Sequence, residues 1–95
     1  MGIVKAGAYD RGFNIWTKVI DTTDATTGLT AIAIECVVSA TVSVMTGFDE
    51  LGAAVDFKTV YNLDELTAGY IYYIKPNHYV DAITLTDGTV NTHNI

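Results

Sequence analysis

The sequence has very little of several features that would assign a function directly. Its single cysteine, Cys36, excludes an internal disulfide framework, because a disulfide needs two thiols. Only 5 lysine and arginine residues stand against 11 acidic residues, and the basic residues are spread along the chain without a cluster. Direct nucleic-acid binding needs grouped lysine or arginine side chains that neutralise phosphates. We therefore expect no nucleic-acid partner.

Long apolar runs are also missing. The longest uninterrupted run is Tyr70–Ile74, whereas a membrane-spanning helix needs about 20 apolar residues. The first residues lack the charged and apolar regions of a secretory signal, and Ala6 stands where a myristoylated N-terminus carries serine or threonine. We therefore expect no membrane partner.

What the sequence does contain is a large apolar fraction for so short a chain. Its 95 residues are 49% hydrophobic and 17% charged, with a mean hydropathy of +0.28 and a formal net charge of -6. Soluble domains typically carry about 25% charged residues. A single domain of this length has much surface for its volume, so this many apolar side chains are hard to bury within one copy. We expect the chain to self-associate or to dock on a larger assembly.

Alternation of apolar and polar residues predicts an all-β fold made of short antiparallel strands, with glycine, asparagine and aspartate between them. The segment 30–45 predicts two strands joined by a tight turn or bulge near residues 38–40. Further strands are expected over residues 55–61 and 70–75. The arrangement that these strands favour is a compact antiparallel β-sandwich or small barrel.

The clearest local signal is the dipeptide Asp87-Gly88 within ITLTDGTVNT. A two-residue Asp-Gly loop fits a type I′ turn, whose central residues have positive φ. Such a hairpin places Ile83, Leu85 and Val90 on one face. We predict a half-buried hairpin that closes the β-domain, with Asp87 serving the turn.

The N-terminal part differs in character, because its apolar residues are scattered and follow no sustained period. We predict an extended arm or irregular segment over residues 1–28, followed by the antiparallel β-domain over residues 29–95. The most strand-like part of the arm is residues 13–20. Trp16 is expected to anchor the arm on a neighbouring surface.

Residues that could carry catalysis or bind a metal are few. Cys36 lies on the apolar side of its predicted strand, which indicates a buried structural thiol. His78 and His93 match no short zinc-ligand spacing. Asp21 and Asp24 lack the alternating ligands and closing glutamate of a calcium loop, and turns that involve Asp and Thr side chains explain them.

Two pairs of adjacent acidic residues, Asp49 with Glu50 and Asp64 with Glu65, fall in predicted loops. Paired carboxylates perform glycoside hydrolysis, but adjacent loop carboxylates are mostly solvated charge. We expect no enzyme activity, no cofactor and no metal.

Tyrosines are the most suggestive feature of the sequence. Exposed aromatic side chains on a sheet could anchor a protein interface or stack on sugars, and we favour sheet packing or a subunit interface. The candidate interface residues are Phe13, Trp16, Tyr70, Tyr72, Tyr73 and Tyr79.

Three segments follow one another along the chain: TAIAIECVVSATVSVMTG, LTAGYIYYI and VDAITLTDGTV. The order of a strand that leads to a Thr-Gly turn, a leucine-small-glycine stretch and a terminal hairpin resembles small virion proteins of tailed bacteriophages. Capsid decoration (cement) proteins and head-fibre bases are the members that it is similar to. The likeness covers about residues 29–90. It departs at KPNHYV, where the related pattern often has a glycine.

The resemblance implies a structural virion protein that stabilises the phage head by binding the major capsid protein or another virion protein. It further implies a homo-oligomer, with a trimer favoured, which is made in the host cytoplasm and located on the capsid surface. The alternative is a carbohydrate-binding or fibre-attachment module on a phage tail or head fibre, which the tyrosines motivate.

Overall fold

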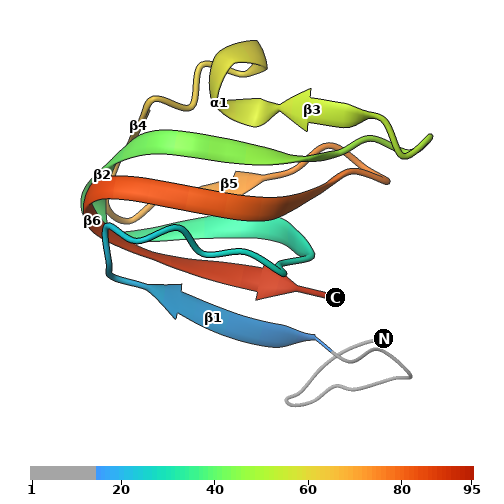
Figure 1. Ribbon diagram of the computed structural model, residues 1–95. Helices are drawn as coiled ribbons and strands as arrows, with labels where there is room; N and C mark the ends of the chain where they lie inside the picture. The colour runs from blue at the N-terminus through green and yellow to red at the C-terminus, as the bar shows by residue number, and fades with distance from the viewer. Residues whose placement is uncertain (1–14) are drawn as a thin grey trace.

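The computed structural model describes residues 15–95 and confirms the all-β prediction (Figure 1). These residues form antiparallel strands and one short helix. These elements are β1 (Trp16–Ile20), β2 (Ala31–Phe48), β3 (Ala54–Asp56), α1 (Phe57–Val60), β4 (Glu65–Leu66), β5 (Ile71–Tyr73) and β6 (Tyr79–Asn94).

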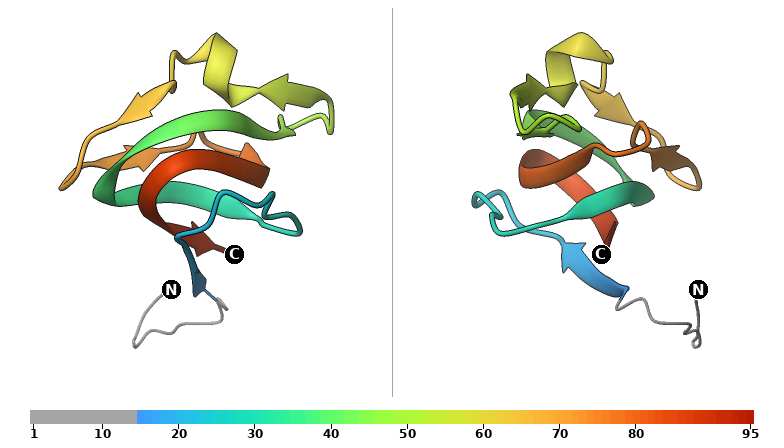
Figure 2. Two further views of the ribbon diagram at one scale, coloured as in Figure 1. Left: turned by 60° about the vertical axis from the view of Figure 1, so that its left-hand side comes forward. Right: turned by 90° about the vertical axis from the view of Figure 1, so that its right-hand side faces the viewer.

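Two long strands, β2 and β6, organise the whole sheet. They run antiparallel to each other over nearly their full lengths. The short strands β3, β4 and β5 pair in turn with the other edge of β2, and β1 pairs with the C-terminal half of β6. Both long strands curve strongly, so the sheet folds back over itself without closing into a complete barrel (Figure 2).

The hydrophobic core fills the space between the two halves of the bent sheet. Burying each large aliphatic or aromatic side chain stabilises the fold by about 1.5–3 kcal/mol. The largest apolar side chains of this core are Ile20, Ile34, Val42, Met45, Phe57, Leu66, Val80, Ile83, Leu85 and Val90.

The predicted hairpin at Asp87-Gly88 is wrong, because β6 runs without interruption through both residues. Of the tight turn or bulge predicted near residues 38–40, the turn is wrong, since β2 is also continuous, and the bulge is confirmed, because the pairing with β6 shifts register there. Gly88 does adopt the positive φ that a turn would need, at 85°, but here it serves an irregularity within a strand. The register between β2 and β6 shifts several times in this region, as it does at β-bulges.

The prediction of which residues face inward is nevertheless confirmed. Ile83, Leu85 and Val90 are all buried. Side chains alternate along a regular strand, so Leu85 and Val90 would lie on opposite faces of an uninterrupted one. An extra residue in a bulge restores them to the same face, just as a two-residue turn would. The sequence pattern therefore fits both structures equally well.

Aspartate at position 87 and glycine at position 88 each make a contact with β2 at the bend. The Asp87 carboxylate accepts a hydrogen bond from the backbone N–H of Thr41 at 2.8 Å. A Cβ atom on Gly88 would lie 2.4 Å from the carbonyl oxygen of Ser39 and 2.5 Å from the Cα of Ala40. The two strands can approach this closely only because residue 88 has no side chain.

A one-turn helix replaces most of the strand predicted over residues 55–61. β3 ends at Asp56, whose carboxylate accepts hydrogen bonds from the Thr59 backbone N–H at 3.2 Å and the Thr59 hydroxyl at 2.9 Å. This is the N-cap arrangement that starts a helix. The cap therefore overrides the short alternating pattern that follows it.

Residues 15–28 of the predicted arm lie on the β-domain. Ile20 of β1 is buried in the core. The buried side chain of Asn94 links three elements, because its amide donates to the carbonyl of Trp16 at 3.3 Å and its oxygen accepts from the Thr30 N–H at 2.9 Å. Phe13 and the rest of the arm lie outside the described residues.

Replacing Gly88 with alanine should destabilise the protein more than the same change at Gly28. Both glycines have positive φ, at 85° and 75°, but a Cβ at Gly28 meets no atom within 4 Å. Gly28→Ala should therefore lower the free energy of unfolding by about 1–2 kcal/mol, the strain of a left-handed residue. Gly88→Ala should lower the free energy of unfolding by about 1–3 kcal/mol more than this, because the new Cβ overlaps neighbouring atoms. Urea unfolding followed by circular dichroism measures both, and equal losses would contradict the close contact at the bend.

Candidate binding surfaces

Cys36 is buried, as predicted, with 1% of its surface exposed. Its thiol donates a hydrogen bond to the carbonyl of Val38 at 3.2 Å. Burial raises the pKa of the Cys36 thiol, and a hydrogen bond involving the backbone of Ala40 opposes this only in part. A thiol that holds its proton in the core has the properties of a structural side chain.

The two histidines lie on different parts of the fold. His78 follows β5 in a turn, where its Nδ1 lies 2.9 Å from the carbonyl oxygen of Pro76. His93 is on β6, and its Nε2 lies 3.2 Å from the Glu35 carboxylate of β2. Within residues 15–95, no three histidine, cysteine or acidic side chains gather where they could hold a metal ion.

The acidic pairs serve local structure and do not face one another. Asp49 closes the loop between β2 and β3, where its carboxylate accepts the N–H of Leu51 at 2.8 Å and of Ala53 at 2.9 Å. Asp64 forms an ion pair with Lys58 at 3.0 Å. Glu50 and Glu65 are exposed.

The exposed acidic residues before β2 form a turn. Asp21 and Asp24 are both exposed. The backbone N–H of Asp24 donates to the Thr22 hydroxyl oxygen at 3.1 Å, which is the serine/threonine type of turn. The described chain also contains no helix long and apolar enough to cross a membrane.

One outward-facing surface of the sheet is built from four strands and carries exposed apolar side chains at its two ends. We call the outward side of the β5–β2–β6–β1 part of the sheet the outer face. Cross-strand register builds it from two rows, Tyr73–Ala33–His93–Thr17 and Ile71–Glu35–Asn91–Val19.

The two ends of the outer face are apolar and its centre is polar. Tyr73 and Ile71 of β5 are 79% and 47% exposed, and Val19 of β1 is 54% exposed. Between them, His93 bridges the Glu35 carboxylate and the hydroxyl of Thr17, at 3.2 Å and 3.4 Å. An open depression of about 310 Å³ lies on this face, lined by Ile15, Ile32, Ala33, Ile71, Tyr73 and His93.

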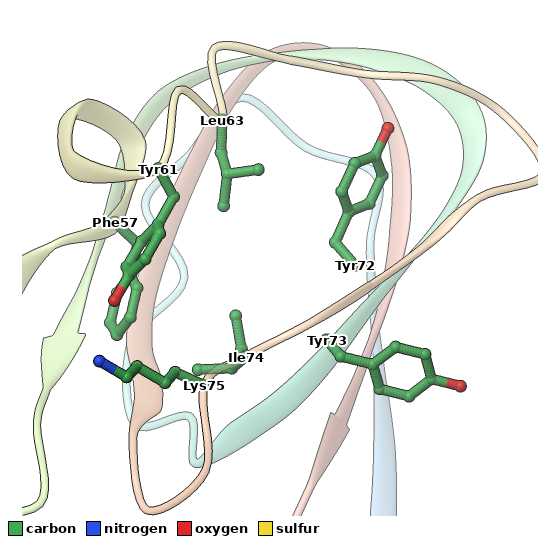
Figure 3. A pocket seen from close by; sticks show the side chains of 7 residues that line it. All are labelled: Phe57, Tyr61, Leu63, Tyr72, Tyr73, Ile74 and Lys75. Atoms are coloured by element: carbon green, nitrogen blue, oxygen red, sulfur yellow. The ribbon is translucent and has the colours of Figure 1, made fainter.

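A second hollow lies between β5 and the segment around α1 (Figure 3). It has a volume of about 290 Å³ and is lined by Phe57, Tyr61, Leu63, Tyr72, Tyr73, Ile74 and Lys75. Because these side chains come from both sides of the gap, we call this hollow the α1–β5 pocket.

The walls of the α1–β5 pocket are held in place by other parts of the fold. Phe57 is buried, and the Tyr61 ring stacks on it with centroids 5.6 Å apart. On the opposite wall, the Tyr72 hydroxyl accepts a hydrogen bond from the backbone N–H of Thr67 at 2.8 Å. Leu63 and Ile74 point into the space between these walls (Figure 3). The pocket is therefore preformed.

The candidate interface residues predicted from the sequence lie in three different places. Tyr73 belongs to the outer face, and its side chain points away from the α1–β5 pocket (Figure 3). Tyr72 forms a wall of that pocket, and the exposed Tyr70 stacks against Tyr72 with ring centroids 6.4 Å apart. Tyr79 is half-buried and packs on Phe48.

Trp16 lies in β1, at one end of the sheet that residues 15–95 form, and is 43% exposed. Phe13, the other N-terminal member of the predicted set, lies outside the described residues. The aromatic side chains of the predicted set therefore do not form a single site in the part of the chain that the structure describes.

Sequence reasoning missed the residues that complete both surfaces. Ile15 and Val19 join Ile71 only through strand pairing, which no local pattern reveals. The Phe57–Tyr61 stack could have been found, because Asp56 followed by Thr59 is a helix-capping signal and residues four apart share a helix face.

Comparison of this chain with protein-family models, with curated proteins and with solved structures gave no match.

Stability at low pH should depend on Asp49. Hydrogen bonds from the backbone of Ala53, and then of Leu51, lower the pKa of the Asp49 carboxyl. A lowered folded-state pKa gives stability that is complete above the unfolded value of about 3.9 and is lost as pH falls through the folded value. Asp49→Asn keeps an acceptor oxygen but does not titrate.

The Asp49→Asn variant should therefore lose less stability than the wild type between about pH 6 and about pH 2. Urea midpoints at the two pH values measure the difference. Glu50→Gln, a change at the exposed neighbouring carboxylate, is the control and should behave as the wild type. If Asp49→Asn loses as much stability as the wild type between these two pH values, Asp49 does not contribute to the pH dependence of stability.

Proposed function

We propose that this protein is a structural virion protein of a tailed phage, a capsid decoration subunit that stabilises the head by binding the major capsid protein. The observation that supports this most is the outer face, where Ile71, Tyr73 and Val19 are exposed at the two ends of a sheet surface. Large apolar side chains gathered on one face of a small domain are typical of protein-binding surfaces.

The chemistry of the outer face suits a protein partner. Tyrosine and large aliphatic side chains supply most of the affinity at interfaces when they become fully desolvated. The Glu35–His93–Thr17 chain at the centre pairs some of its polar groups with one another, which lowers the cost of covering it. A stable contact needs about 800 Å² from each partner, and the outer face offers four adjacent strands toward that area.

In this proposal the subunits also associate with each other. The apolar composition exceeds what one small domain can bury, and exposed apolar residues also occur away from the outer face, at Leu51, Val60 and Tyr61. A homotrimer on the capsid surface would cover part of this excess while it binds the shell. The protein would be made in the host cytoplasm and would act mechanically, through contacts made by several subunits.

Capsid binding by outer-face variants tests the proposal. The wild-type protein should sediment with decoration-free capsids of its phage, and light scattering should give a mass of several subunits. Tyr73→Ser should weaken capsid binding by about 30-fold, the effect expected when an interface anchor is lost. Leu51→Ser is the matched control, because Leu51 is 89% exposed but lies in the loop after β2.

A monomer that fails to bind capsids would overturn the proposal. Equal weakening by Tyr73→Ser and Leu51→Ser would remove the outer face as the contact surface.

Carbohydrate binding on a phage tail or head fibre is the second candidate. It is favoured by the exposure of Tyr70 and Tyr73, at 61% and 79%, because exposed tyrosine rings stack on sugars. A glycan array decides between the candidates. Binding of a defined glycan that both Tyr70→Ala and Tyr73→Ala weaken would favour this function, whereas an array without any bound glycan would exclude it.

A further inference from the structure

The outer edge of β5 offers backbone groups to a further strand. The N–H of Cys36 donates to the carbonyl of Tyr70, and the N–H of Ile74 donates to the carbonyl of Ile32, both at 2.9 Å. Residues 70, 72 and 74 thus turn their backbone groups toward β2. Because these groups alternate in an antiparallel pair, the N–H and C=O of Ile71 and Tyr73 point the other way. Within residues 15–95, β5 pairs with β2 alone.

The α1–β5 pocket lies directly beside this edge. One of its walls is Tyr72 and Ile74, and the other is the Phe57–Tyr61 stack (Figure 3). A strand added along β5 would place alternate side chains on the pocket side and on the outer face. Backbone pairing then gives affinity, and the pocket gives specificity for one side chain.

The size and lining of the pocket define that side chain. Its volume of about 290 Å³ is just below the range of roughly 300–1,000 Å³ that ligand pockets span, so one large side chain suits it better than a drug-sized molecule. The walls are aromatic and aliphatic, and Lys75 is the one charged residue among those that line it. The occupant is therefore apolar and large, such as tryptophan, phenylalanine or leucine.

Lys75 indicates which charge the bound segment should carry next to its large apolar side chain. The ion pairs found in the described part of the chain join Lys58 to Asp64 and His93 to Glu35, and neither involves Lys75. The Lys75 side chain runs along the pocket toward the Phe57–Tyr61 stack (Figure 3). A carboxylate two residues from the inserted side chain would share its face of the added strand and meet this ammonium group.

We propose that β5 and the α1–β5 pocket bind an extended segment of a partner protein as an added strand, with a large apolar side chain in the pocket and an acidic residue against Lys75. The proposed function enters only in identifying the partner as a capsid protein. The chemistry of the segment follows from the pocket and the strand edge themselves.

Peptide titration of the full-length protein, followed by the NMR signals of its backbone amides, tests this proposal. The probe is acetyl-Glu-Val-Trp-Val-Glu-amide, which places both glutamates on the same face as the tryptophan. We expect it to shift the amide signals of Ile71 and Tyr73 together with those of Tyr61 and Tyr72. A peptide with serine for tryptophan should bind about 30-fold more weakly, and one with lysine for both glutamates about tenfold more weakly.

Two variants test separately the charge of Lys75 and the backbone pairing at the edge of β5. Lys75→Glu should reverse the preference, so that the lysine peptide binds better than the glutamate peptide, and a purely structural effect could not produce this reversal. Ile71→Pro removes the outward N–H at an edge position that tolerates proline, and it should abolish binding. Ile71→Ala is its matched control and should keep most of the affinity.

The possible outcomes distinguish this inference from the proposed function. The inference is overturned if the tryptophan peptide leaves Ile71 and Tyr73 unshifted, if serine binds as well as tryptophan, or if Lys75→Glu keeps the original preference. Nuclear Overhauser contacts from residues 1–14 to Ile71 in the free protein would also overturn it, because the chain's own N-terminal segment would then be the occupant. Because the titration needs no capsid, failure of capsid binding alone counts against the proposed function only.

Discussion

The antiparallel pairing of β2 with β6 is the interaction on which the rest of the structure depends. Every other strand pairs with one of these two, and the core is enclosed only because both strands bend together. At the bend the two backbones come close together at Gly88, and the backbone N–H of Thr41 donates a hydrogen bond to the Asp87 carboxylate. Both contacts join residues that are far apart in the sequence, so the bend belongs to the tertiary structure.

The surfaces available for binding follow from this bend. The pairing assembles the outer face from four strands that are distant in sequence, because β5 lies against one edge of β2 and β6 carries β1 on the other side. The same arrangement leaves β5 at an edge, beside the one-turn helix that Asp56 begins. Both candidate surfaces therefore share β5, with Tyr73 on one side of the strand and Tyr72 on the other.

The outer face and the α1–β5 pocket suit different kinds of contact. The outer face is broad, open and centred on a polar chain of residues, which suits contact with another folded surface. The α1–β5 pocket is small and preformed, which suits a single side chain from an extended segment. A subunit that holds a large assembly together benefits from having both, because two modest contacts made at once bind far more tightly than either does alone.

Local sequence patterns determined the fold class and the inward-facing residues of the last strand. Alternation places Ile83 and Leu85 on one face, since parity along a strand is a local property, and either a two-residue turn or a bulge brings Val90 to the same face. The choice between a hairpin and a bulged strand at Asp87-Gly88 was not local. It depends on whether the two halves of this segment pair with each other, as in a hairpin, or both pair with β2, as they do here.

For the candidate surfaces too, the sequence determined one part and the tertiary structure the other. Composition alone indicated that aromatic and apolar side chains would remain exposed, because 95 residues cannot bury so many. Which of them share a surface was decided by tertiary structure, since Val19, Ile71 and Tyr73 meet only through register across β2 and β6. The sequence by itself thus determined that large apolar side chains remain exposed, and strand pairing decided which of them lie together.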